Sequence, residues 1–120
     1  NVSEDDVREV QKAGCVVIHC PRSNEALGCG KFPWELYAKH GVSVAVGTDS
    51  LGSSPSLSTE QETHFAQTLH GEAVNPLALV WSATKGGYRA LGMPVPRFMR
   101  GESAENVYIW SRDKSVTTKA

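Results

Sequence analysis

The chain has 120 residues, of which 40% are hydrophobic and 21% are charged, and its formal net charge at pH 7 is −1. This composition is typical of a soluble globular protein, while the scattered Lys and Arg residues exclude the basic footprint of a nucleic-acid-binding or membrane-surface protein. There is no signal-peptide pattern, and no apolar run reaches the roughly 20 residues of a membrane-spanning helix, so we expect a cytoplasmic protein without nucleic-acid or membrane partners.

The first predicted element is a short helix over residues 4–13. Ser3 is a favourable N-cap with Asp6 three residues later, and the acidic first turn suits the helix dipole. Gly14 is a natural stop for this helix. The chain opens on Asn1 rather than on a methionine, directly ahead of the helix, and we therefore expect a processed chain or a piece of a longer protein.

A continuous apolar run follows over residues 15–20. Its β-branched residues predict a strand that is buried on both faces, and Pro21 ends its hydrogen-bond ladder. Cys15 and Cys20 flank this strand, where we expect them to behave as small buried apolar residues rather than as disulfide partners. Residues 22–31 are rich in Ser, Asn and Gly and predict a loop.

The rest of the chain continues the alternation of helices and strands. We predict, in order, a helix over 32–40, an apolar strand over 42–47, a Ser/Gly/Pro loop over 51–58, helices over 59–69 and 76–91, a short strand over 106–110 and a polar tail. Strands that alternate with helices favour a parallel sheet, but two strands alone do not make a stable one. The sequence therefore carries part of the pattern of a larger α/β body.

Polar residues follow both predicted strands at the ends where parallel α/β folds place their functional groups. The first strand leads into His19–Asn24 and the second into Gly47–Ser50. Asp49 is the residue of most interest, because a carboxylate directly after a buried strand is desolvated unless it is paired or bound to a cation. From position alone, a turn or N-cap aspartate explains Asp49 equally well.

The order and spacing of several segments resemble the last two strands of the amidohydrolase superfamily barrel and the chain that follows them. These segments are His19–Asn24, Leu27–Gly30, Pro33, Gly41–Val42, Gly47–Ser50, Ala83–Gly92 and Gly101–Val107. The branch that they resemble contains chlorohydrolases and the guanine, S-adenosylhomocysteine and aminofutalosine deaminases. The resemblance implies an α/β fold with part of a TIM-type (β/α)₈ barrel over residues 1–93. Residues 94–120 would form a return strand toward a composite β-sandwich, with a tail.

The resemblance also implies a metal-dependent hydrolase of carbon–nitrogen bonds that are not peptide bonds. Asp49 would end the eighth barrel strand, bind a divalent metal (Zn²⁺, with Fe²⁺ as the alternative) and take a proton from the activated water. The small-molecule substrate would be a purine-like or nucleoside amine, with aminofutalosine as a specific case. Ser23 and Asn24 would shape the loop beside the substrate, although Ser or Asx turns explain them at least as well.

The four histidines are better explained as structural or solvated residues than as metal ligands. His64 and His70 are six residues apart rather than the four of a helical zinc pair. His19 lies on a strand that supplies no ligand in the resembled family, and His40 suits a helix C-terminus.

The chain lacks the His-x-His that the resemblance calls for, and one carboxylate is far short of a four-ligand site. We therefore expect this chain alone to be inactive, with the remainder of the barrel as its necessary partner; a homo-oligomer stays open. The alternative is a non-catalytic remnant, or a fragment that folds only against the rest of a barrel. A cytidine-type deaminase is excluded by the absence of Pro-Cys-x-x-Cys, and Gly28-Cys29-Gly30 is too short for a dinucleotide fingerprint.

Overall fold

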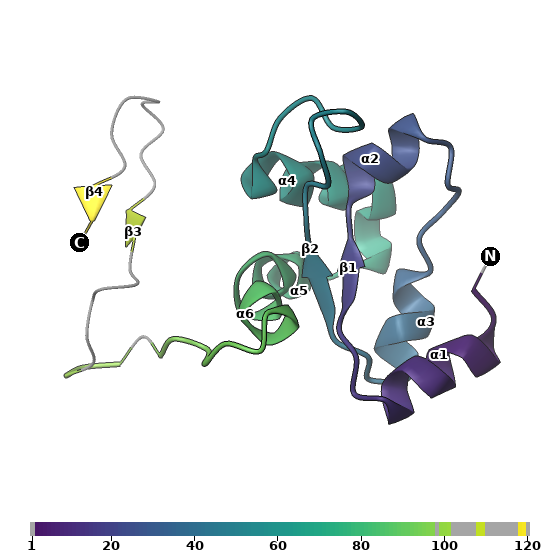
Figure 1. Cartoon of the computed structure of the whole chain (residues 1–120), viewed down its shortest axis with the longest axis horizontal. Helices are drawn as coiled ribbons and strands as arrows, with labels where there is room; N and C mark the ends of the chain where they lie inside the picture. The colour runs from purple at the N-terminus through teal and green to yellow at the C-terminus, as the bar shows by residue number, and fades with distance from the viewer. Residues whose placement is uncertain (1, 98, 102–107, 110–117, 120) are drawn as a thin grey trace.

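The computed structural model of the chain describes residues 2–97, 99–101, 108–109 and 118–119 (Figure 1). Its elements in chain order are α1 (Glu4–Lys12), β1 (Val17–His19), α2 (Pro21–Ala26), α3 (Trp34–Lys39), β2 (Val44–Val46), α4 (Thr59–His70), the 3₁₀ turn η1 (Gly71–Ala73), α5 (Pro76–Trp81), the π-helical segment η2 (Ser82–Gly86), α6 (Gly87–Ala90), β3 (Tyr108–Ile109) and β4 (Thr118–Lys119).

Helix α1 begins where the sequence predicts and ends at Lys12, one residue before the predicted end, with Ala13 as its C-cap. The Ser3 hydroxyl accepts a hydrogen bond from the Asp6 amide at 3.2 Å, and the Asp6 carboxylate accepts one from the Ser3 amide at 2.8 Å, which is a complete capping box. At the other end, Gly14 adopts a φ of +65°, a left-handed conformation that suits glycine. The boundaries of this helix are therefore set by its own local sequence.

Strands β1 and β2 form the predicted parallel pair. Their register places Val17 opposite Val44 and His19 opposite Val46, and both strands end on the side of the molecule where α2 and α4 lie (Figure 1). Two clusters of buried side chains hold the helices against the strands: Trp34, Ala66, Val74 and Leu79 in one, and Val7, Tyr37 and Val42 in the other. Phe32 and Val44 pack against both clusters and join them.

The prediction that the first strand is buried on both faces is wrong. His19 is fully buried, but Ile18 is 57% exposed, Cys15 is exposed and Cys20 is only half-buried. Side chains alternate between the two faces of a strand, and in the described part of the chain the helices that pack on β1 cover the face of His19 but not that of Ile18. The apolar run therefore matches a strand whose second face lacks a covering layer here.

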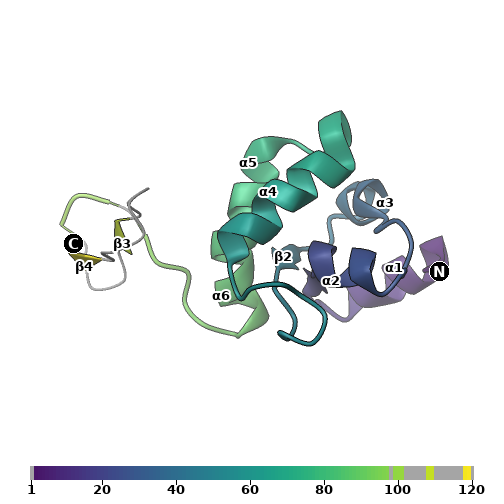
Figure 2. The same cartoon turned by 90° about the horizontal axis from the view of Figure 1, so that it is seen from above.

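The predicted loop over residues 22–31 begins instead with helix α2. Pro21 stands at the first position of this helix, where its missing N–H costs no hydrogen bond and its fixed φ is already helical. Pro21 thus both ends β1 and starts α2. Taken only as the end of the strand, this proline predicts a loop where α2 begins. Seen along the perpendicular direction, α2 lies beside the loop that joins β2 to α4 (Figure 2).

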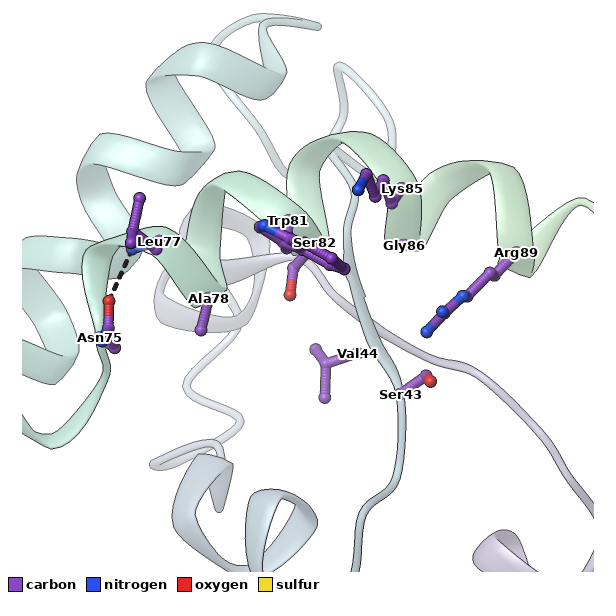
Figure 3. A pocket seen from close by; sticks show the side chains of 10 residues that line it. All are labelled: Ser43, Val44, Asn75, Leu77, Ala78, Trp81, Ser82, Lys85, Gly86 and Arg89. Carbon is purple, nitrogen blue, oxygen red and sulfur yellow. Dashed lines mark hydrogen bonds between the residues drawn. The ribbon is translucent and has the colours of Figure 1, made fainter. Parts of the chain in front are cut away.

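The helix predicted over 76–91 is a continuous helical stretch formed by α5, η2 and α6, and it crosses β2 at Gly86. A Cβ atom on Gly86 would lie 2.7 Å from the Val44 carbonyl oxygen and 3.1 Å from the Ala45 Cα, so only glycine permits this approach. The same crossing forms a groove of about 420 Å³ in which Trp81 and Val44 face each other (Figure 3). The Lys85 ammonium lies 3.7 Å from the centre of the Trp81 ring, a cation–π contact.

Beyond residue 97, the structure describes residues 99–101, 108–109 and 118–119. Strands β3 and β4 pair antiparallel, with Tyr108 opposite Lys119 and Ile109 opposite Thr118. Strand β3 falls within the predicted strand over 106–110, whose other residues lie outside the described ones, as does most of the predicted return toward a β-sandwich. None of the helices that the structure describes is long and apolar enough to cross a bilayer.

Candidate functional site

Asp49 stands three residues after the end of β2, and its backbone conformation is unusual. Its φ is +58°, which makes it the only non-glycine residue with a positive φ among the described residues. Asp and Asn tolerate this left-handed conformation better than other side chains do. Just before it, a Cβ atom on Gly47 would meet the Ile18 side chain at 2.8 Å, so a glycine is needed where the two strand ends converge.

Two serine hydroxyls hold the carboxylate of Asp49. The Ser23 hydroxyl, from α2, donates to Oδ2 at 2.7 Å, and the Ser53 hydroxyl, from the β2–α4 loop, donates to the same atom at 2.9 Å. These hydrogen bonds, first that of Ser23 and then that of Ser53, hold the pKa of Asp49 below its ordinary value of 3.8. The carboxylate is therefore ionised at neutral pH, and within the described residues its Oδ1 atom receives no side-chain hydrogen bond.

The surroundings of Asp49 differ from the predicted desolvated site. The residue is exposed, and the sheet that β2 forms has only β1 as a second described strand. The explanation as an N-cap does not hold either, since the Ser58 hydroxyl caps α4 by accepting a hydrogen bond from the Gln61 amide at 3.2 Å. Asp49 is thus an exposed carboxylate that α2 and its own loop hold in place.

Asn24 does not reach Asp49, although its neighbour Ser23 does. Its side-chain nitrogen lies 3.4 Å from Nδ1 of His19. The His19 ring is fully buried, stacks on Phe32 with ring centroids 4.0 Å apart, and places its Nε2 atom 3.1 Å from Nε2 of His70. The structure therefore brings Ser23 to the carboxylate and Asn24 to a buried histidine pair.

Two of the four histidines, His19 and His70, are buried, His40 is half-buried and His64 is exposed. Burial, with a smaller contribution from His70, lowers the pKa of His19 to about 4, and burial also lowers the pKa of His70. His40 pairs with Glu4 at 2.9 Å, joining the end of α3 to α1, and His64 is exposed on α4. None of the four lies in a cluster with Asp49 among the described residues.

A buried ion pair beside the site was missed by sequence reasoning. Arg22 Nε donates to Glu62 Oε1 at 2.7 Å, and the Arg22 backbone amide donates to Glu62 Oε2 at 3.0 Å. Glu62 is wholly buried, and only 12% of the Arg22 side chain is exposed. The two residues are 40 positions apart, so no local sequence pattern predicts their contact. The one available signal was a charged residue, Arg22, directly before Ser23.

Asp49 has the chemistry of one metal ligand, and the described part of the chain does not complete a site. An ionised carboxylate that follows a parallel strand suits a divalent cation such as Zn²⁺. However, no group of three or more His, Cys, Asp or Glu side chains that could hold a metal occurs among the residues that the structure describes. Any further ligands must therefore come from elsewhere.

Comparisons with known proteins agree on one family. The model of the amidohydrolase family matches residues 2–114. The chain is 44% identical to an aminodeoxyfutalosine deaminase of Deinococcus radiodurans over 94% of its length, and 40% identical to a probable guanine deaminase of the same organism over 88%. It is also 33% identical over 87% of its length to a 5-methylthioadenosine/S-adenosylhomocysteine deaminase of Pyrococcus abyssi. The chain spans 27%, 25% and 26% of these three relatives, respectively.

Solved structures give the same relationship. An adenosine deaminase from Xanthomonas campestris with bound zinc superposes with a TM-score of 0.68 and 31% identity, covering 77% of this chain and 22% of that protein. The guanine deaminase of E. coli superposes with a TM-score of 0.70 over 78% of this chain and 22% of that protein, and at 24% identity it shows the shared fold.

Proposed function

The chain belongs to the amidohydrolase family, and we propose that it is the C-terminal part of a metal-dependent deaminase to which it supplies Asp49. In this proposal β1 and β2 are the last two strands of a (β/α)₈ barrel within residues 1–93, and residues 94–120 return toward a second, β-rich region. A barrel of this type takes about 250 residues, and the chain spans about a quarter of the relatives that it matches. The remaining strands would come from the rest of that protein.

The observation that carries the proposal is the placement of the Asp49 carboxylate. It stands at the C-terminal end of a parallel strand, where barrel enzymes place their functional groups. Ser23 and Ser53 hold Oδ2, and among the described residues no side chain donates a hydrogen bond to Oδ1. Zn²⁺ is the metal that we propose, supported by the zinc-bound adenosine deaminase that resembles this chain, and Fe²⁺ is the alternative.

A divalent ion held by Asp49 and by ligands from the rest of the protein would supply a more acidic water molecule for attack on the carbon that carries the amine, which would leave as ammonia. The chain's own contribution is to hold the Asp49 carboxylate ionised and in one orientation. Because the serine hydroxyls lower the pKa of Asp49, they favour its role as a ligand more directly than its role as a proton acceptor. The proposal includes both the ligand role and the proton-acceptor role of Asp49, which zinc content and kcat can separate.

The substrate that we propose is a purine-like or nucleoside amine. The similarity to an aminodeoxyfutalosine deaminase, at 44% identity, supports an aminofutalosine-type compound as the first candidate. Ser23 and Asn24 would lie beside the substrate, and the fixed position of Ser23 next to Asp49 supports the first of these two assignments. Ammonia release from aminodeoxyfutalosine, guanine, 5′-methylthioadenosine and adenosine by the full-length protein would separate the candidates.

Asp49→Asn in the full-length protein tests the proposal. Asn tolerates the left-handed backbone at this position, so the variant removes the charge without forcing the loop to move. We expect bound zinc to fall below one equivalent and turnover to fall by about 10²- to 10⁴-fold. Asp5→Asn, at an exposed position on α1, is the matched control. Unchanged zinc content would contradict the ligand role, and unchanged kcat would contradict both roles.

The alternative is a chain that binds no substrate, either a remnant or a segment that folds only against a barrel. The sequence of a longer parent protein, ahead of residue 1, would separate an enzyme part from a remnant. A functional parent must contain the His-x-His that this chain lacks. The isolated chain should show no deaminase activity with added Zn²⁺, since one carboxylate does not make a four-ligand site. Turnover by the isolated chain would contradict the proposal that it is one part of the enzyme.

A further inference from the structure

The Arg22–Glu62 ion pair connects the two segments that hold the Asp49 carboxylate. Arg22 is the second residue of α2 and precedes Ser23, which donates to Asp49. Glu62 lies in the first turns of α4, immediately after the loop that contains Asp49 and Ser53. The pair therefore joins the segments on either side of the carboxylate, and it does so from the buried side.

The contacts of the pair extend along the β2–α4 loop. One guanidinium nitrogen of Arg22, Nη2, donates to the carbonyl and hydroxyl oxygens of Ser56, each at 3.0 Å, and Nη1 donates to the Gln61 side chain at 2.8 Å. The Ser54 hydroxyl donates to Glu62 Oε1 at 3.0 Å. A single arginine and a single glutamate thus hold three points of the chain between Ser54 and Glu62.

The geometry also fixes the beginning of α2. The backbone amide of Arg22 has no partner within its own helix, because it belongs to the first turn, and it donates to Glu62 Oε2 at 3.0 Å. One carboxylate therefore binds both the main chain and the side chain of the residue next to Ser23. Glu62 is thus connected to Asp49 by a chain of contacts through the start of α2 and Ser23.

We propose that Arg22 and Glu62 are positioning residues, which keep the Ser23 and Ser53 hydroxyls and the Asp49 carboxylate in one arrangement for metal binding. The inference rests on the proposed function of Asp49 and adds two residues that do not touch the metal or the substrate. A buried ion pair contributes little net stability compared with well-packed apolar residues, so the role that its geometry supports is the specification of one loop conformation. Groups that orient a ligand change metal affinity by about 10- to 100-fold when they are removed.

The first arm of the test measures the loop itself and does not depend on catalysis. The variants are Arg22→Lys, which keeps the charge but offers one nitrogen where the guanidinium uses three, and Glu62→Gln, which removes the buried carboxylate. We expect faster amide hydrogen exchange over residues 49–58, by about tenfold or more, with exchange in β1 and α1 unchanged. Glu4→Gln is the matched control, because Glu4 also joins two helices, at 2.9 Å from Lys39. Wild-type exchange over 49–58 in Arg22→Lys would overturn the inference.

The second arm measures zinc affinity, kcat and KM of the full-length holoenzyme. We expect Arg22→Lys to weaken zinc binding by about 10- to 100-fold in competition with a chelator, and to lower kcat at subsaturating zinc with little change in KM. A role in stability alone would lower the melting temperature and leave the zinc affinity of the folded protein unchanged, and that result would overturn the positioning role.

The two proposals fail separately. If the wild-type protein binds no zinc, or Asp49→Asn binds it as well as the wild type, the proposed function is wrong and the inference about positioning for metal binding is overturned with it. If Asp49→Asn loses zinc but Arg22→Lys and Glu62→Gln bind it as the wild type does, the proposed function stands and the inference is overturned.

Discussion

The buried His19–His70 pair makes the stability of the fold depend on pH. His19 is fully buried and its pKa in the folded chain is about 4, against an ordinary value of 6.5 that applies to the unfolded chain. The unfolded state therefore binds more protons between these two values, and stability falls as the pH is lowered. At about 1.4 kcal/mol for each pH unit, the difference amounts to about 3 kcal/mol. The lowered pKa of His70 acts in the same direction.

The predicted loss of stability at low pH can be measured by unfolding. The contribution of His19 is fully present above about pH 6.5 and is lost as the pH falls toward 4. Urea unfolding, followed by tryptophan fluorescence at several pH values across this window, should show the free energy of unfolding of the wild type falling by at least about 3 kcal/mol. The glutamine in His19→Gln cannot be protonated, so the fall should be smaller by about 3 kcal/mol, whatever the absolute stability of the variant.

His64→Gln is the matched control for this experiment. His64 is exposed on α4, the helix that also carries His70, and its replacement should leave the pH dependence as it is in the wild type. The reasoning would be refuted if His19→Gln and the wild type lost the same free energy between pH 6.5 and 4.

Two further predictions concern the helices. Gly86→Ala should destabilise the fold by about 1–2 kcal/mol, because the new methyl group meets the backbone of Val44 and overpacking outweighs the gain in helix propensity. Its helical neighbour Gly87 has open space around it, so Gly87→Ala should stabilise by about 0.5–1 kcal/mol, and equal melting temperatures for the two variants would contradict the close packing. Ser58→Ala should cost about 1 kcal/mol by removing the N-cap of α4, whereas Ser58→Gly should cost only a few tenths, as measured by thermal unfolding.

Local sequence was sufficient for those elements whose boundaries depend on neighbouring residues. The capping box of Ser3 and Asp6 and the glycine after α1 lie within one helix, and the two apolar runs predicted β1 and β2 and their parallel pairing. Helix α2 was missed because Pro21 suits both the end of a strand and the first turn of a helix. The exposure of Ile18 was missed because an apolar run does not show whether both faces of its strand are covered.

The sequence was enough to place Asp49 and Ser23 after the two strand ends, but not to predict the other contacts around them. Asp49 and Ser23 follow strand ends, and their contact at 2.7 Å is what the meeting of two parallel strand ends produces. The Arg22–Glu62 pair depends on how α2 and α4 pack across 40 residues of chain, and no spacing rule reaches that far. Long-range polar contacts of this kind become visible only when the helices are placed in space.

The left-handed backbone conformation of Asp49 limits which residue types this position tolerates. A carboxylate with a longer side chain, such as Glu, keeps the charge but meets a steric penalty that Asp largely avoids, and β-branched residues meet a larger one. In a saturation library at codon 49, the well-folded members should therefore be concentrated in Asp, Asn and Gly, and only the first of these carries a charge. A screen for folded protein would then select Asp, Asn and Gly, whereas a screen for activity would select Asp alone. The difference between the two screens would separate the chemical requirement at this residue from the backbone requirement.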